Sequence, residues 1–130
     1  MPYLHIQISG AEDAPLAERV ATRATELTSR LLGKNASHTA VVVDFIGSGR
    51  WFIAGKPVAE GVRSYHWMVS ITDETNTRAE KAAYLAAVHQ AMDELLGGVA
   101  EHSYAHVADL RGSAYGFGGR TQEYRSHHPA

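Results

Sequence analysis

The segment PYLHIQI at residues 2–8 determines the start of the fold, because its apolar and polar side chains alternate with a period of two. Three aliphatic residues share one side of such a segment, and three polar or aromatic residues share the other: Leu4, Ile6 and Ile8 against Tyr3, His5 and Gln7. This alternation is typical of a β-strand with one buried face. We therefore predict a strand here, with its aliphatic side against a hydrophobic core.

A helix and a second strand are predicted next. Asp13 can cap a helix that has Pro15 in its first turn, and Gly33 supplies the stop. Five apolar residues recur between these signals at helical spacing: Leu16, Val20, Ala24, Leu27 and Leu31. Residues 40–46 are rich in β-branched side chains and predict a strand, which a glycine turn and the short stretch 50–53 follow.

The same order of elements recurs after a linker that contains glycine and proline. Residues 66–71 alternate again and predict a strand. Thr77 and Glu80 have the spacing of a capping box at the start of a second helix. Residues 104–110 predict a fourth strand, and an aromatic, glycine-rich stretch follows at 114–119. The chain therefore contains two strand-helix-strand units.

The two units match at a spacing of 64 residues. The matched pairs are Leu31 with Leu95, Leu32 with Leu96, Gly33 with Gly97, Val43 with Val107, Trp51 with Tyr115, Gly55 with Gly119 and Lys56 with Arg120. Aligned helix stops together with aligned aromatic turns indicate a fused duplication. We expect one domain over residues 1–130, built of pseudo-repeats 2–56 and 65–120, with a C-terminal tail at 121–130.

Two such units predict an α+β fold. A strand, a helix and a second strand imply a crossover between parallel strands, so two units predict a four-stranded mixed sheet. Both helices are amphipathic and are expected on one face of it. The other face would carry Tyr3, several valines and, depending on register, Trp67 or Met68. These residues are too apolar for water, so we expect subunits to associate there.

Composition excludes several classes of function. The chain has 130 residues, a net charge of −2 and no cysteine. Thiolate chemistry and disulfides are therefore excluded, and scattered basic residues give no patch for nucleic acid. No secretion signal or membrane-spanning run is recognisable, so a cytoplasmic location is expected.

Pro2 is the candidate catalytic residue. Methionine aminopeptidases remove Met1 when the second residue is small, proline included, which would leave a free secondary amine. An α-amino group usually has a pKa of about 7.7–8.0. Burial would disfavour the protonated form of this amine and lower its pKa below that range, so that it could act as a general base. The alternative is a proline that merely begins a strand.

Pro2 before a strand, the helix, the valine-rich strand and the turn into residues 50–55 resemble the 4-oxalocrotonate tautomerase family. The second half resembles another copy of the unit, as in fused members such as the cis-3-chloroacrylic acid dehalogenases and malonate semialdehyde decarboxylases. The resemblance covers residues 2 to about 120. It implies a tautomerase or MIF-like fold and a homotrimer whose pockets form where the N-terminus of one subunit meets its neighbour.

The chain departs from the family at known functional positions. Members acting on 2-hydroxymuconate carry arginines where this chain has Glu12 and approximately Ala40. Dehalogenase-type members carry two arginines just before the second helix, where this chain has Asp73 and Asn76. They also carry a glutamate where this chain has approximately Ala114. These departures argue against the dicarboxylate substrate and against hydrolytic dehalogenation.

The arginines beside the aromatic turns remain as candidates for binding an anionic enol or carboxylate: Arg50, Arg63, Arg111 and Arg120. Arg111 is the first choice, because it ends the fourth strand and a guanidinium suits bidentate carboxylate binding. Each arginine could instead be a solvated surface residue. The other substrate-binding candidates are Trp51, Tyr115, Phe117 and Asn76. The aromatic residues could equally belong to an interface, and Asn76 could simply help to start the second helix.

No metal or cofactor is expected. The eight histidines show no compact ligand spacing. The glycines at 112–119 do not open a helix, so a dinucleotide-binding fingerprint is excluded.

The sequence thus predicts a tautomerase acting on a small 2-oxo acid or enol, with Pro2 as the general base and an arginine stabilising the charge on oxygen. One alternative is a hydratase, dehalogenase or decarboxylase in which the prolinium is the acid. Another is an oligomer that keeps the fold without the chemistry.

Overall fold

The computed structural model describes residues 1–59 and 61–129, so Ala130 of the expected tail lies outside the described residues. Within that part of the chain, four strands form the main sheet in the order β2-β1-β5-β6. Their bounds are Tyr3–Ser9 (β1), Ala40–Ile46 (β2), Tyr65–Thr72 (β5) and Tyr104–Leu110 (β6). β1 pairs with β2 and β5 with β6 in parallel, whereas the central pair β1 and β5 is antiparallel. The predicted four-stranded mixed sheet is confirmed.

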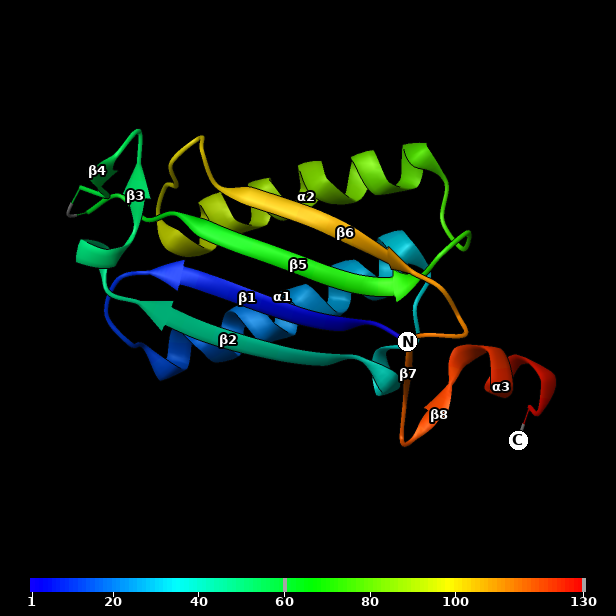
Figure 1. The fold of residues 1–130 in the computed structure, drawn as a ribbon. Helices are drawn as coiled ribbons and strands as arrows, with labels where there is room; N and C mark the ends of the chain where they lie inside the picture. Colours follow the sequence, from blue (N-terminus) through cyan, green and yellow to red (C-terminus); the bar gives the residue numbers. More distant parts are fainter. Residues whose placement is uncertain (60, 130) are drawn as a thin grey trace.

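Two long helices lie together on one face of this sheet, behind it in Figure 1: Ala14–Leu32 (α1) and Arg78–Leu96 (α2). The Asp13 carboxylate accepts a hydrogen bond from the Leu16 backbone N–H at 3.0 Å and caps α1. Thr77 and Glu80 form the capping box of α2. Both helices end at a left-handed glycine, Gly33 and Gly97. The predicted starts and stops of both helices are confirmed. They could be predicted because each depends on hydrogen bonds between residues close in the chain.

The remaining elements are short. Two small hairpins are formed by Phe52–Ile53 (β3) with Lys56–Pro57 (β4), and by Gly116–Phe117 (β7) with Arg120–Thr121 (β8). Single turns of 3-10 helix cover Ala36–His38 and Ser48–Arg50. The helices, the outer strands and both hairpins recur at a spacing of 64 residues. The expected tail contains a short helix, Gln122–His127 (α3).

The core lies between the sheet and the two helices. Trp67 is fully buried there, and its indole N–H donates to the Tyr84 hydroxyl at 3.0 Å. The same hydroxyl is 2.8 Å from the Thr28 hydroxyl, so the buried polar atoms of all three side chains are satisfied. Trp67 therefore faces the helices, and Met68 occupies the other side of β5. This settles the register that the sequence left open.

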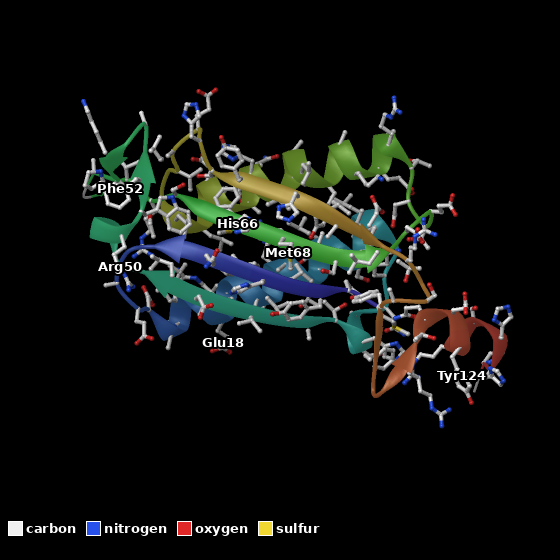
Figure 2. The ribbon with its side chains drawn as sticks, in the orientation of Figure 1. Glu18, Arg50, Phe52, His66, Met68 and Tyr124 are labelled. Atoms are coloured by element: carbon white, nitrogen blue, oxygen red, sulfur yellow. The ribbon has the colours of Figure 1, made fainter. Side chains whose placement is uncertain are left out.

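The opposite side, which we call the open sheet face, consists of the alternate residues of the four strands that point away from the helices. Figure 2 shows two of them, His66 and Met68, on β5. Large apolar side chains are exposed on it, including Tyr3, Val42 and Leu110, and Tyr104 is 68% exposed. No helix in the described part of the chain combines the length and apolar character needed to cross a bilayer.

Candidate active site

Strand direction gathers several loops around Pro2. β2 runs parallel to β1, so both strands begin at this end of the sheet. β5 and β6 run the other way, so both end here. The loops that carry Lys34, Asn76, Arg111 and Tyr115 therefore meet at the end of the sheet where β1 starts. Figure 1 shows β7, β8 and α3 gathered near the mark of the N-terminus.

The first two residues are held firmly in this position. Pro2 is buried, and its carbonyl accepts a hydrogen bond from the Ala40 backbone N–H at 3.3 Å. The Tyr115 hydroxyl can donate to the carbonyl of Met1 or to that of Ser70, the latter at 3.1 Å. The Met1 sulfur lies 3.1 Å from Nδ1 of His38. Met1 thus fills the space between Tyr115 and His38, directly beside the proline.

An aromatic layer continues outward from Met1. The Phe117 ring lies 5.5 Å from the His38 ring, measured between centroids. The Arg125 guanidinium lies 3.9 Å from the centroid of the Phe117 ring, a cation-π contact. The same guanidinium donates to the Phe117 carbonyl at 3.0 Å. The tail helix α3 therefore supports the hairpin that carries Tyr115 and Phe117.

The electrostatic environment favours a neutral amine at this terminus. Burial lowers the pKa of the Met1 amine below its usual value, and the nearby positive charge of Lys34 lowers it further. Burial also lowers the pKa of Lys34, whereas Glu80 and Asp109 act in the opposite direction. Lys34 Nζ donates to the Thr75 hydroxyl at 2.8 Å. An amine and a lysine therefore share a partly desolvated site.

Lys34 is the site residue that sequence reasoning missed. It follows the helix stop Gly33 directly, and a lysine after a helix usually serves the helix dipole or solvent. Its position in the chain therefore carries no signal of chemistry. Only the pairing of β1 with β2 brings the end of α1 next to the N-terminus.

Four of the predicted substrate-binding residues lie at the Pro2 end of the sheet: Asn76, Arg111, Tyr115 and Phe117. Arg111 is exposed immediately after β6. The Asn76 side-chain amide donates to the Leu32 carbonyl at 2.9 Å, so it joins the end of α1 to the start of α2. Tyr115 contacts the N-terminus directly.

Arg50 and Trp51 lie at the opposite end of the sheet. They follow β2, which runs away from Pro2 for seven residues, or about 20 Å at roughly 3.3 Å per residue. Figure 2 labels Arg50 at the end of the molecule far from α3. Trp51 lines a small hollow there with Phe52, His102 and Tyr104. Within one subunit these two residues do not share a pocket with Pro2.

A larger hollow, about 490 Å³, lies elsewhere along the outside of α1. Charged and apolar residues of the two helices line it: Pro15, Glu18, Arg19, Thr22, Arg23, Glu26 and Leu95. It is an open groove that contains no histidine, hydroxyl pair or buried amine, so we do not assign the chemistry to it. Over residues 1–59 and 61–129, no three metal-ligating side chains are grouped to hold an ion.

No model of a protein family and no curated protein matches the sequence. Solved structures do match over nearly the whole chain. The structure described as R7 fused 4-OT wild type asymmetric trimer is 15% identical, covers 95% of this chain and 98% of its own, and has a TM-score of 0.83. The protein Pt0534 inactivated by 2-oxo-3-pentynoate is 15% identical, with 94% and 97% coverage and a TM-score of 0.83.

A macrophage migration inhibitory factor-like protein from Entamoeba histolytica is 16% identical, with coverage of 92% and 97% and a TM-score of 0.76. At these identities the likeness concerns the fold. The chain has the fold of the fused 4-OT and macrophage migration inhibitory factor-like proteins, as the sequence predicted.

Proposed function

We propose that this chain is a cytoplasmic, cofactor-independent tautomerase of the 4-oxalocrotonate tautomerase superfamily that acts on a small 2-oxo acid or enol. Pro2, exposed by removal of Met1, is the general base. The observation that carries the proposal is the amine site at the start of β1, where burial and Lys34 both lower the pKa of an amine. Pro2 lies one residue further into this site and is buried. The same two causes would lower the pKa of a free prolyl nitrogen there and so increase the neutral fraction that can act as a base.

Met1 occupies the place that we assign to the substrate. Its carbonyl accepts from the Tyr115 hydroxyl, and its sulfur lies against His38. Removal of Met1 takes away that acceptor and leaves the Ser70 carbonyl, at 3.1 Å, as the remaining partner of the phenol, which a substrate oxygen beside the proline nitrogen could replace. Burial raises the pKa of Tyr115, so this phenol stays protonated and can donate to a substrate oxygen.

The proposed reaction moves one proton. Neutral Pro2 removes it from the carbon next to the keto group or from the enol hydroxyl, and the electron pair shifts to the neighbouring carbon or oxygen. Lys34, Tyr115 and Arg111 are the donors that stabilise negative charge on the oxygen. The prolinium then returns the proton to the other atom of the keto-enol pair, which regenerates the amine.

Assembly is part of the proposal. Three fused 4-OT structures with this fold are described as trimers, and the open sheet face exposes apolar side chains that need a cover. We infer a homotrimer formed through this face. In it, the turn with Arg50 and Trp51 from one subunit could complete the pocket at the Pro2 of its neighbour, although the two ends are far apart within one chain.

The dehalogenase or decarboxylase alternative predicts the opposite dependence on pH. A base with a lowered pKa is active above that pKa, so kcat/KM for phenylpyruvate should rise with pH and level off below the usual range of about 7.7 to 8.0. A prolinium acid would lose activity over the same range. Initial rates at constant ionic strength distinguish the two, and a falling profile would favour the acid.

A direct test combines mass spectrometry with a reactive 2-oxo acid. The purified chain should have the mass of the sequence without Met1. The conjugated alkyne of 2-oxo-3-pentynoate can add a neutral amine, with nitrogen bonding to carbon and the amine proton moving to the adjacent carbon. We expect the adduct on the N-terminal peptide at Pro2, together with loss of turnover. Retention of Met1 would remove the proposed base, and an unmodified, inactive protein would favour the non-catalytic alternative.

Lys34→Met should lower kcat/KM by about 10²-fold, because one cationic donor to the developing oxyanion is lost. It should also move the rising limb of the pH profile to higher pH, since Lys34 contributes to lowering the pKa of the terminal amine. Arg19→Met is the matched control, because it also removes a positive charge, and Arg19 is exposed on α1 in the groove to which no chemistry is assigned. An unchanged rate and profile for Lys34→Met would exclude Lys34 from the site.

A further inference from the structure

Three histidines form a cluster on the open sheet face, one each from β1, β5 and β6. His66 Nε2 lies 3.4 Å from His106 Nδ1, and their rings stack with centroids 5.2 Å apart. The other nitrogen of His66 lies 3.0 Å from the Gln7 side-chain oxygen. His5 pairs with Met68 across the β1–β5 ladder, and Met68 pairs with His106 across the β5–β6 ladder. Neighbouring strands therefore bring the imidazoles together.

Little negative charge is available to this cluster. Apart from aspartate and histidine, the four strands contain no charged residue type: they have no glutamate, lysine or arginine. Asp44 on β2 is the acidic group that faces the cluster, and its carboxylate is bound to His5 at 2.7 Å. The groups that face His66 itself are His5 and Gln7 from β1 and His106 and Tyr104 from β6. Among the residues that the structure describes, a protonated His66 or His106 thus has a second imidazole, and no acid, as its neighbour.

The surroundings of the cluster are apolar and exposed. Val42 and Tyr3 flank it on one side and Tyr104 on the other, all with more than a third of their surface in water. Burial of these side chains by a second copy would also remove water from the imidazoles between them. Desolvation disfavours the charged form of an imidazole that has no acidic partner, so such an interface favours neutral rings at His66 and His106, whereas His5 is paired with Asp44.

We propose that this histidine cluster controls assembly: copies of the chain associate through the open sheet face while the paired imidazoles of His66 and His106 are neutral, and separate when protonation charges this pair. The inference rests on the proposed homotrimer and adds its regulation. A closed symmetric assembly brings the same cluster from every subunit into one interface, so charging the rings sets like charges against each other.

The direction of the pH dependence follows from the cluster in the single subunit. Burial lowers the pKa of His66 below its usual 6.5, and His106 and His5 lower it further. A group with a lowered pKa binds fewer protons in the buried state than in the free state. Burial in the assembly would lower this pKa further, so the assembly is most stable above the lowered pKa of the single subunit and weakens as the pH falls below it.

Sedimentation velocity at fixed protein concentration, from about pH 8 to about pH 5, tests the proposal. The wild-type chain should sediment as a trimer at the upper end and as a smaller species at the lower end, with far-UV circular dichroism unchanged. His66→Gln with His106→Gln keeps polar side chains that cannot titrate, and should remain a trimer throughout. His102→Gln, an exposed histidine outside the strands, should behave as wild type.

Three results would overturn the proposal. If the wild-type trimer persists to pH 5, the proposed control by pH is wrong and only the proposed assembly remains. Dissociation of the double variant at the same pH as wild type would assign the effect to other groups. A monomer at every pH would overturn both the assembly and its regulation. Tautomerase activity at about pH 8 is measured on the same samples, so a failure of the proposed reaction is seen separately.

Discussion

Replacement of Pro2 by alanine is expected to lower kcat/KM for keto-enol tautomerisation by about 10²- to 10⁴-fold, the usual contribution of a positioned general acid or base. Alanine is also small at the second position, so Met1 should still be removed and the chain should still begin with an amine. The primary amine of alanine lacks the ring that fixes the backbone and buries the nitrogen. The base is then free to rotate away from the substrate.

The fold should tolerate this change. β1 begins at Tyr3, and the hydrogen bond at residue 2 uses the backbone carbonyl, which alanine keeps. Thermal unfolding and sedimentation should therefore match the wild-type chain. Intact mass measures the processing of both proteins. A loss of less than tenfold in the processed variant would show that catalysis does not depend on the proline ring.

Gly116→Ala should disrupt the candidate site around Pro2, although the two residues are far apart in the sequence. A Cβ at this position would collide with the carbonyl group of Arg120 and would lie 2.7 Å from the Thr121 Cα, across the β7–β8 hairpin. These are backbone atoms, so they cannot move aside without separating the strands. Overpacking of this kind costs about 1 to 3 kcal/mol. We expect the hairpin to open.

The consequence for activity should be large because Tyr115 and Phe117 flank Gly116. Opening the hairpin withdraws the Tyr115 hydroxyl from the N-terminus, and removal of one such donor costs about 10²- to 10³-fold in rate. Gly49→Ala is the control for the stability effect, since within residues 1–59 and 61–129 nothing lies within 4 Å of a Cβ there. Melting curves and kcat/KM are compared for both variants. Wild-type activity in Gly116→Ala would exclude the hairpin from catalysis.

Much of the fold could be predicted because its signals are local. The capping box of Thr77 and Glu80 and the left-handed stop at Gly33 involve residues within a few positions of one another. Alternation along residues 2–8 identified the face of β1 that is buried. The side of β5 that faces the core was not predicted, because both Trp67 and Met68 are apolar and only packing against Tyr84 distinguishes them.

The candidate site was predicted less completely. Tyr115 was found through its match with Trp51, yet the structure puts the two residues at opposite ends of the sheet. The central antiparallel pair explains this, because it reverses the second unit relative to the first. Equivalent positions in a repeated sequence therefore do not share one pocket within the subunit.

The sequence by itself determined the helices, the strands, their ends and the repeat, since periodicity and capping act between residues close in the chain. Only the tertiary structure decided that Lys34 lies beside the N-terminal amine and that His5, His66 and His106 form a cluster. These neighbours are separated by 30 residues or more, and they meet because of strand order and direction. Charge and burial, which control the pKa of the amine and of His66, arise only after that pairing is complete.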